Sequence, residues 1–112
     1  MSQRARKRFG QNFLHDHTVI EQIVDAVSPA PSDHLVEIGP GRGALTVPLA
    51  PRCARLDLIE IDRDLVGPLV GQFADAPHVQ VHNVDALSFD FASLYTGAPL
   101  RVVANLPYNI ST

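Results

Sequence analysis

The sequence contains no tryptophan, one methionine and one cysteine among its 112 residues. The single cysteine, Cys53, excludes an internal disulfide framework and fits a reducing compartment such as the cytoplasm. None of the five histidines stands at zinc-site spacing from Cys53, so we expect no metal centre. No apolar run has the length of a membrane span, and no apolar stretch follows the basic N-terminus as a secretory signal requires. We therefore expect a cytoplasmic protein without a membrane segment or a bound metal.

Positive charge is scarce overall but concentrated at the N-terminus. The formal net charge is −3, which by itself argues against a nucleic-acid partner. Four of the nine cationic residues nevertheless fall in the first eight positions: Arg4, Arg6, Lys7 and Arg8. Such a basic arm, here residues 1–15, is a common way to hold phosphate groups. A solvated terminus without a partner is the alternative interpretation.

Strand-like and helix-like segments alternate from residue 16 onwards. Asp16 can cap a helix that runs to Val27, with apolar residues recurring on one face. Two further helices are expected over 44–50, where Pro51 would end the helix, and over 62–73. Apolar, β-rich segments predict strands over 34–38, 56–61, 79–82 and 100–104. This alternation predicts an α/β fold with a parallel sheet, right-handed crossovers and flanking helices.

Glycines and acids follow the predicted strands. The string Glu37-x-Gly39-x-Gly41-x-Gly43 comes directly after the first strand and before a helix. Its spacing fits neither a dinucleotide-binding fingerprint nor a P-loop, so on its own it is equally compatible with a tight turn. Glu60 lies at the end of the second strand and could accept ribose hydroxyls, while Asp85 follows the third and could accept an adenine amino hydrogen or cap a turn. Because the ends of parallel strands meet at one edge, together these residues predict a nucleoside site there.

The last eight residues, 105–112, follow the fourth strand and read Asn-Leu-Pro-Tyr-Asn-Ile-Ser-Thr. The amide oxygen of Asn105 can accept one hydrogen of an exocyclic amine, and a backbone carbonyl freed by the proline can accept the other. Tyr108 can stack on a flat base, an interaction worth roughly 1–3 kcal/mol per base in nucleic-acid complexes. The segment thus predicts a site for a base that carries an amino group.

Taken together, these motifs resemble the class I S-adenosylmethionine-dependent methyltransferases, and more closely the KsgA-type ribosomal RNA adenine dimethyltransferases of the small subunit. The resemblance extends over nearly the whole chain in the family's order. It is carried by five strings: residues 8–14 (RFGQNFL), 36–46 (VEIGPGRGALT), 59–62 (IEID), 83–86 (NVDA) and 105–112 (NLPYNIST).

The resemblance implies a Rossmann-like fold and a role for each candidate residue. Asn12 and Leu14 would close over the cofactor S-adenosylmethionine, Gly39 and Gly41 would lie against its methionine part, Glu60 would hold the ribose and Asp85 the adenine. Asn105 would lie between cofactor and substrate, with Leu106 supplying the carbonyl and Tyr108 the stacking ring. The implied reaction is dimethylation of N6 of two adjacent adenosines in 16S ribosomal RNA of the immature small subunit. Arg4, Arg6, Lys7 and Arg8 would contact that RNA.

The resemblance also implies that residues 16–112 form only the N-terminal part of the methyltransferase domain, truncated after the fourth strand. The later strands and a C-terminal helical domain would be absent, and we expect the 112-residue chain by itself to be inactive. Three alternatives remain open at this stage: a large-subunit adenine dimethyltransferase of the macrolide-resistance type, a non-catalytic RNA-binding assembly factor, and a dinucleotide oxidoreductase, which the glycine spacing disfavours.

Overall fold

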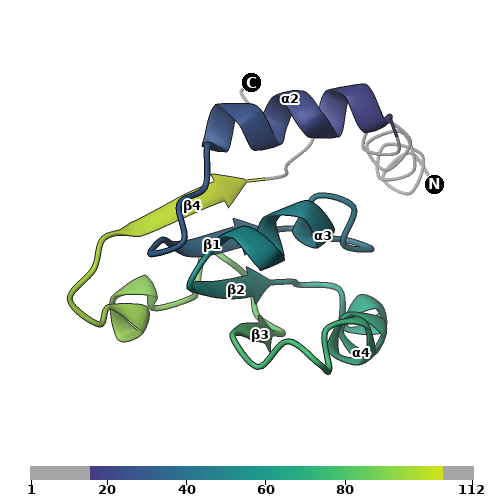
Figure 1. The fold of residues 1–112 in the computed structure, drawn as a ribbon. Coiled ribbons are helices and arrows are strands. Elements are labelled where there is room, and N and C mark those ends of the chain that lie inside the picture. The colour runs from purple at the N-terminus through teal and green to yellow at the C-terminus, as the bar shows by residue number, and fades with distance from the viewer. Residues whose placement is uncertain (1–15, 105–112) are drawn as a thin grey trace, which may run out of the picture.

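The computed structural model describes residues 16–104, which form a four-stranded parallel sheet with helices packed on it (Figure 1). The strands lie in the order β3-β2-β1-β4 and span Val79–His82, Arg55–Ile59, His34–Ile38 and Leu100–Ala104 in that order. The chain moves outward from β1 to β2 and β3, then returns to pair β4 with the other side of β1. The parallel α/β sheet predicted from the sequence is therefore confirmed.

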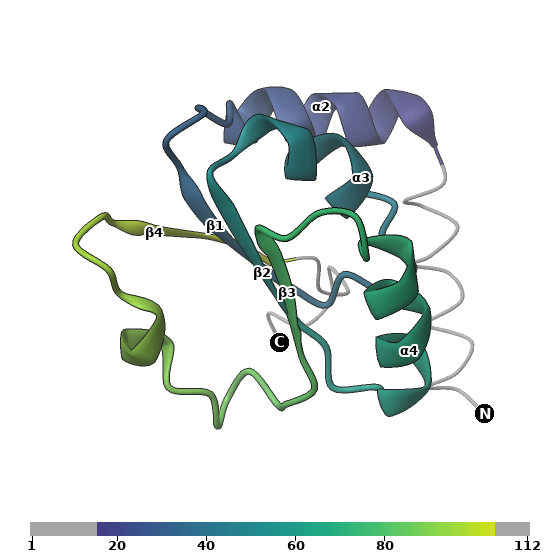
Figure 2. The same ribbon diagram turned by 60° about the horizontal axis from the view of Figure 1, so that its bottom comes forward.

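Three helices cover one face of the sheet, as Figure 2 shows: α2 (His17–Val27), α3 (Thr46–Leu49) and α4 (Arg63–Gln72). Side chains of a strand alternate between the two faces, so Leu35, Leu56, Leu58 and Val79 point towards these helices. They form the main core with apolar residues that the helices and their flanking turns supply: Ile20, Val24, Leu45, Leu49, Ala50 and Leu69. No helix in residues 16–104 has the length and apolarity needed to span a membrane.

The connection from β3 to β4 crosses the opposite face of the sheet (Figure 2). It contains the 3₁₀ turn Phe91–Leu94, in which Leu94 is buried against Val36 and Ile59. Phe89 packs on the ring of His82 and on Phe91, with ring centroids 5.2 and 5.0 Å apart. This crossing on the second face makes β1 the point at which the strand order reverses, where open α/β sheets bind their ligands.

The helix caps follow the sequence closely. The carboxylate of Asp16 accepts a hydrogen bond from the Thr18 amide at 2.9 Å, and Asp62 caps α4 in the same way through the Asp64 amide. The predicted strands 34–38, 79–82 and 100–104 are confirmed to the residue.

Several boundaries differ from the prediction. β2 spans 55–59, not 56–61, and the Glu60 side chain beyond its end accepts hydrogen bonds from two loop amides. The helix predicted over 44–50 spans only Thr46–Leu49. Pro51 does not stop the helix that begins near Thr46: a 3₁₀ turn continues over Ala50–Arg52. Proline occupies the start of that turn, where its missing N–H removes no internal bond.

β4 is an edge strand of the described sheet because it pairs only with β1. Arg101 anchors it: the guanidinium contacts Asp33 at 2.7 Å and also donates to the Val27 carbonyl. A hydrogen bond from the Ala30 amide and another from Arg101 hold the pKa of Asp33 below its ordinary value. Val102 of this edge strand is 53% exposed.

Candidate functional site

The four strands end in one row. Ile38 pairs with Ile59 and with Ala104, and Ile59 pairs with His82, so the last residue of every strand stands in register with its neighbours. All strands are parallel, and the segments that follow them therefore emerge at the same edge. Of the predicted site residues, Gly39 and Glu60 come immediately after this row, and Asp85 follows three residues after His82.

The glycine loop needs backbone conformations that side chains disfavour. Gly39, Gly41 and Gly43 have φ values of 72°, 60° and 88°. A Cβ on Gly41 would have no atom within 4 Å, so the loop leaves open space on that side. A Cβ on Gly43 would lie 3.1 Å from Oε1 of Gln72, which shows the loop packed against the end of α4. The loop thus offers bare backbone at the strand edge, as close approach to a ligand requires.

Glu60 joins the glycine loop to the start of α4. Its Oε1 accepts a hydrogen bond from the Gly41 amide at 3.0 Å, and its Oε2 accepts one from the Asp62 amide at 3.0 Å. The side chain is only 4% exposed, so these two bonds hold the carboxylate in one orientation. A carboxylate has about four acceptor positions, which leaves two for hydroxyl groups of a ligand.

Asp85 lies in the loop after β3 and is exposed. Its Oδ1 accepts a hydrogen bond from the Leu87 amide at 3.0 Å, which is the turn-capping contact that the sequence also allowed. The nearby Asn83 binds across to the neighbouring loop: its Nδ2 donates to the Glu60 carbonyl at 2.8 Å and to the Ile61 carbonyl at 3.3 Å. The loops that carry Glu60 and Asp85 are therefore linked.

Glu37 is a residue to which sequence analysis assigned no role. It is fully buried, and Thr46 donates its hydroxyl to Glu37 Oε1 at 2.6 Å. Its other oxygen, Oε2, has no hydrogen-bond partner among residues 16–104. Burial raises the pKa of Glu37 to about 7, the Thr46 bond opposes the rise, and the negative charge of Glu60 adds to it. A lone acid inside the apolar run Leu35–Ile38 was the signal that could have drawn attention to it.

A second polar group, also missed, lies on the face of the sheet opposite the helices. Asp57 is fully buried and accepts hydrogen bonds from His34 Nε2 at 2.6 Å, His82 Nε2 at 2.7 Å and Arg55 Nε at 3.1 Å. Burial alone would raise the pKa of Asp57, but the bonds from His82, His34 and Arg55 outweigh it and hold the pKa below its ordinary value. These contacts tie β1, β2 and β3 together across the strands. No group of three potential metal ligands in residues 16–104 has a geometry that would hold an ion.

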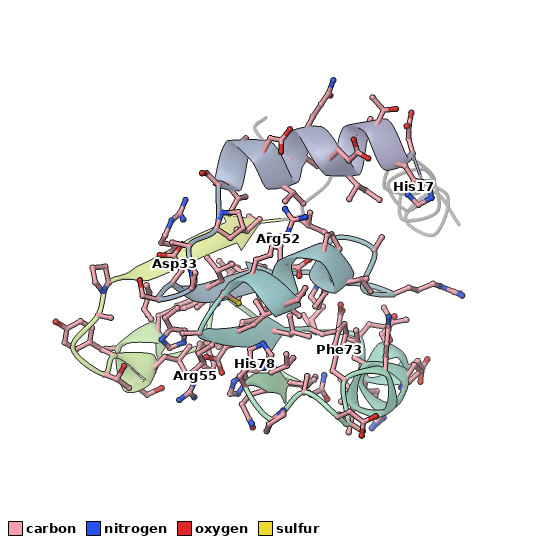
Figure 3. All side chains as sticks on the ribbon, viewed as in Figure 1. His17, Asp33, Arg52, Arg55, Phe73 and His78 are labelled. Atoms are coloured by element: carbon pink, nitrogen blue, oxygen red, sulfur yellow. The ribbon has the colours of Figure 1, made fainter. Side chains whose placement is uncertain are left out.

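A hollow of about 320 Å³ lies at the other end of the strands, bordered by Ala54, Arg55, Pro77, His78 and Gln80. Two of these residues, Arg55 and His78, are labelled in Figure 3. Arg55 begins β2 and His78 precedes β3, so this hollow faces away from the glycine loop. It contains none of the predicted site residues.

The remaining predicted site residues lie outside the described residues. They are Asn12 and Leu14 near the N-terminus, the basic residues Arg4, Arg6, Lys7 and Arg8, and Asn105, Leu106 and Tyr108 after β4. Ala104, the last described residue, pairs with Ile38 in the row of strand ends, directly before the glycine loop.

Solved methyltransferases share this arrangement. The 23S rRNA methyltransferase ErmE superposes with a TM-score of 0.73 and 30% identity, covering 86% of this chain and 38% of that one. A dimethyladenosine transferase from Plasmodium falciparum superposes with a TM-score of 0.70 and 28% identity, covering 84% of this chain and 33% of that one. The N-methyltransferase NodS from Bradyrhizobium japonicum, solved with S-adenosyl-L-homocysteine, gives 0.58 and 31%, covering 70% and 39%. The fold is thus that of the class I methyltransferases.

Within that class the chain is a member of the ribosomal RNA adenine dimethylase family, whose model matches residues 2–112. Curated relatives named ribosomal RNA small subunit methyltransferase A include one from Methylococcus capsulatus, 59% identical over 107 residues, and one from Marinobacter nauticus, 56% identical over 108. Each match covers 96% of this chain but only 42% and 39% of the respective relative. The chain therefore spans about two fifths of the length of these relatives.

Proposed function

We propose that the protein transfers methyl groups from S-adenosylmethionine to N6 of two adjacent adenosines in 16S ribosomal RNA during assembly of the small subunit. The observation that carries this proposal is the common edge at which the glycine loop, Glu60 and the Asn83–Asp85 loop meet. The family supports the same reaction. The identity of 56–59% to relatives named for the small subunit, against 30% to a 23S rRNA methyltransferase, favours the small-subunit RNA.

The residues at this edge fit a nucleoside cofactor. Glu60 keeps two acceptor positions for the ribose hydroxyls, and the space beside Gly41 admits a ligand next to bare backbone, with Gly39 alongside. Asp85 would accept a hydrogen bond from the adenine amino group through Oδ2, since its Oδ1 already accepts one from the Leu87 amide. Asn12 and Leu14 would cover the cofactor from the N-terminal arm.

The N6 amine of the substrate adenine is a weak nucleophile because its lone pair is delocalised into the ring. When bound, S-adenosylmethionine supplies a methyl group on a positively charged sulfur. The Asn105 amide oxygen and the Leu106 carbonyl would accept hydrogen bonds from the N6 amino group. This would direct the nitrogen lone pair at the carbon of the methyl group. Asn105 and Leu106 would hold the amine in this orientation while it gains the methyl group and releases one of its protons to solvent, so no strong base would be required. Such positioning can contribute roughly 7–11 kcal/mol in well-oriented reactions.

The RNA would be held by groups outside this edge. Tyr108 would stack on the adenine once it leaves its neighbours, which offsets part of an unstacking cost of a few kcal/mol. The arm 1–15, through Arg4, Arg6, Lys7 and Arg8, would contact phosphates. In this proposal residues 16–112 are the N-terminal part of the cofactor-binding domain, and the protein acts on immature small subunits in the cytoplasm.

Incubation of the intact protein, at the length its cell makes, with labelled S-adenosylmethionine and immature small subunits tests the proposal. We expect label on N6 of two adjacent adenosines of 16S RNA and none on large-subunit RNA offered in parallel. Label confined to large-subunit RNA would favour the macrolide-resistance type of enzyme. Binding to small subunits without any transfer would leave a non-catalytic assembly role.

Glu60 provides the most direct test of the cofactor site. Glu60→Gln should weaken binding of S-adenosylhomocysteine to the intact protein by roughly tenfold or more, because hydrogen bonds to a charged group contribute about 1.5–3 kcal/mol. Isothermal titration calorimetry measures the dissociation constant. Glu21→Gln, an exposed glutamate on α2, is the matched control and should leave the affinity unchanged. Equal affinities for Glu60→Gln and the wild type would remove Glu60 from the proposed site.

A further inference from the structure

We infer that Asn83 is a positioning residue for cofactor binding: it sets the separation between Glu60 and Asp85, and it acts through Glu60. The inference rests on the proposed function, in which these two acids hold the ribose and the adenine of one nucleoside. A nucleoside is rigid enough that two acids binding its two parts must keep a fixed spacing. Glu60 and Asp85 belong to different loops, so something must hold the loops together.

Asn83 adds a side-chain link to the backbone hydrogen bonds that join the two loops. Its Nδ2 donates to the Glu60 carbonyl at 2.8 Å and to the Ile61 carbonyl at 3.3 Å. Both acceptors are in the loop after β2, while Asn83 lies in the loop after β3, two residues before Asp85. The amide therefore bridges the two loops just beyond the last paired residues, Ile59 and His82.

Backbone hydrogen bonds of Glu60 do not depend on the Asn83 side chain. The Glu60 amide donates to the His82 carbonyl at 2.9 Å, and the Val84 amide donates to the Glu60 carbonyl at 3.2 Å. These two bonds remain when the Asn83 side chain is removed, so the sheet itself stays paired. The contact to Ile61 would be lost, together with the restraint on the stretch between Glu60 and the Asp62 cap of α4. That stretch also carries the Asp62 amide, which orients the Glu60 carboxylate at 3.0 Å.

The chain offers a matched control three residues earlier. Gln80 also donates its side-chain amide to a backbone carbonyl, that of Pro77, at 3.3 Å. Gln80 lies in β3, and its bond lies towards the amino end of that strand and away from Glu60. A general effect of losing an amide-to-carbonyl bond would therefore be seen equally in Gln80→Ala and Asn83→Ala.

The test is a double-mutant cycle in the intact protein, read as the dissociation constant of S-adenosylhomocysteine by calorimetry at a temperature where every variant is folded. Asn83→Ala and the uncharged, similarly sized Asn83→Leu, which removes the donor without adding a charge, should each weaken binding about five- to tenfold. This fold-change corresponds to about 1.0–1.4 kcal/mol of binding free energy. In a Glu60→Gln background the same changes should weaken binding less than twofold, and Gln80→Ala should have no effect.

The outcomes separate this inference from the proposed function. If Glu60→Gln weakens binding and Asn83→Leu does not, the positioning role is wrong and the cofactor site stands. If Asn83→Leu weakens binding equally with and without Glu60, Asn83 does not act through Glu60 and the inference is overturned. If the wild type does not bind S-adenosylhomocysteine, the proposed function and the inference fail together.

Discussion

Replacement of Asp57 by leucine is expected to lower the free energy of unfolding by about 3–5 kcal/mol, the range found when one partner of a buried ion pair is removed. The reason is that Asp57 is the common acceptor for three donors on the helix-free face of the sheet. Without it, His34, which is 3% exposed, keeps a buried N–H with no acceptor, and β1, β2 and β3 lose their shared side-chain link. Urea unfolding at pH 7 measures the loss.

Two further variants make this result specific to the Asp57 cluster. Asp57→Asn keeps the volume and one acceptor oxygen, so its loss should be smaller than that of the leucine variant. Asp25→Asn changes an exposed carboxylate on α2 and should remain within about 0.5 kcal/mol of the wild type. A leucine variant as stable as Asp25→Asn would show that the three contacts contribute nothing net.

The Asp57 contribution should also depend on pH in one direction. Its folded-state pKa lies below the ordinary value of 3.8, because the donated bonds outweigh the effect of burial. A lowered acid pKa adds stability that is present above the unfolded-state pKa and is lost as the pH falls through the folded-state value. The stability gap between wild type and Asp57→Leu should therefore be full above pH 3.8 and shrink below it.

The sequence predicted the skeleton of the fold because short-range chemistry determines it. The apolar run 34–38 and the alternation at 79–82 identify strands without ambiguity, and Asp16 and Asp62 start helices through bonds made within two residues. The glycine loop and Glu60 were placed at one edge because parallel strands align their ends. Such features depend on neighbours in the chain.

What could not be predicted depends on partners distant in the sequence. Glu60 ends β2 early because an amide 19 positions away, that of Gly41, binds its carboxylate. The Asp57 cluster needs the register that puts His34 and His82 on the same face as Asp57, and a register is not visible in one strand alone. The turn at Phe91–Leu94 forms where its Leu94 reaches the core of the second face.

The fully buried acids Asp57 and Glu37 lie on opposite faces of the sheet and differ in how well their oxygens are hydrogen-bonded. Asp57, on the face crossed by the β3–β4 connection, has its oxygens satisfied by donors and serves the stability of the sheet. Glu37, on the helix side, keeps one oxygen without a partner and lies close enough to Glu60 for the charge of Glu60 to raise its pKa. A buried acid that is not fully satisfied next to a ligand edge is a feature that stability alone does not explain.

The second large effect concerns Glu37 and the pH dependence of stability. Its pKa is raised on folding, whereas the pKa of Asp57 is lowered, so the two acids change stability with pH in opposite directions. The pKa of Glu37 rises from 4.5 to about 7 on folding, mainly through burial. Between these two pH values Glu37 is protonated in the folded protein but ionised in the unfolded chain. A raised pKa means that stability is full below pH 4.5 and falls as the pH rises through about 7. At about 1.4 kcal/mol per pKa unit, the loss reaches about 3 kcal/mol by pH 8.

Glu37→Gln should abolish this pH dependence, since the amide is neutral at every pH and its oxygen can still accept from Thr46. The difference in unfolding free energy between the variant and the wild type should shift by about 2.5 kcal/mol in favour of the variant between pH 5 and pH 8. Urea unfolding at both pH values gives the difference, and a carboxyl-carbon NMR titration gives the pKa of Glu37 directly. Glu21→Gln, exposed on α2, should show no such shift. A Glu37→Gln curve parallel to that of the wild type would mean that Glu37 is already ionised in the folded protein, and that its unpartnered oxygen carries a charge inside the core.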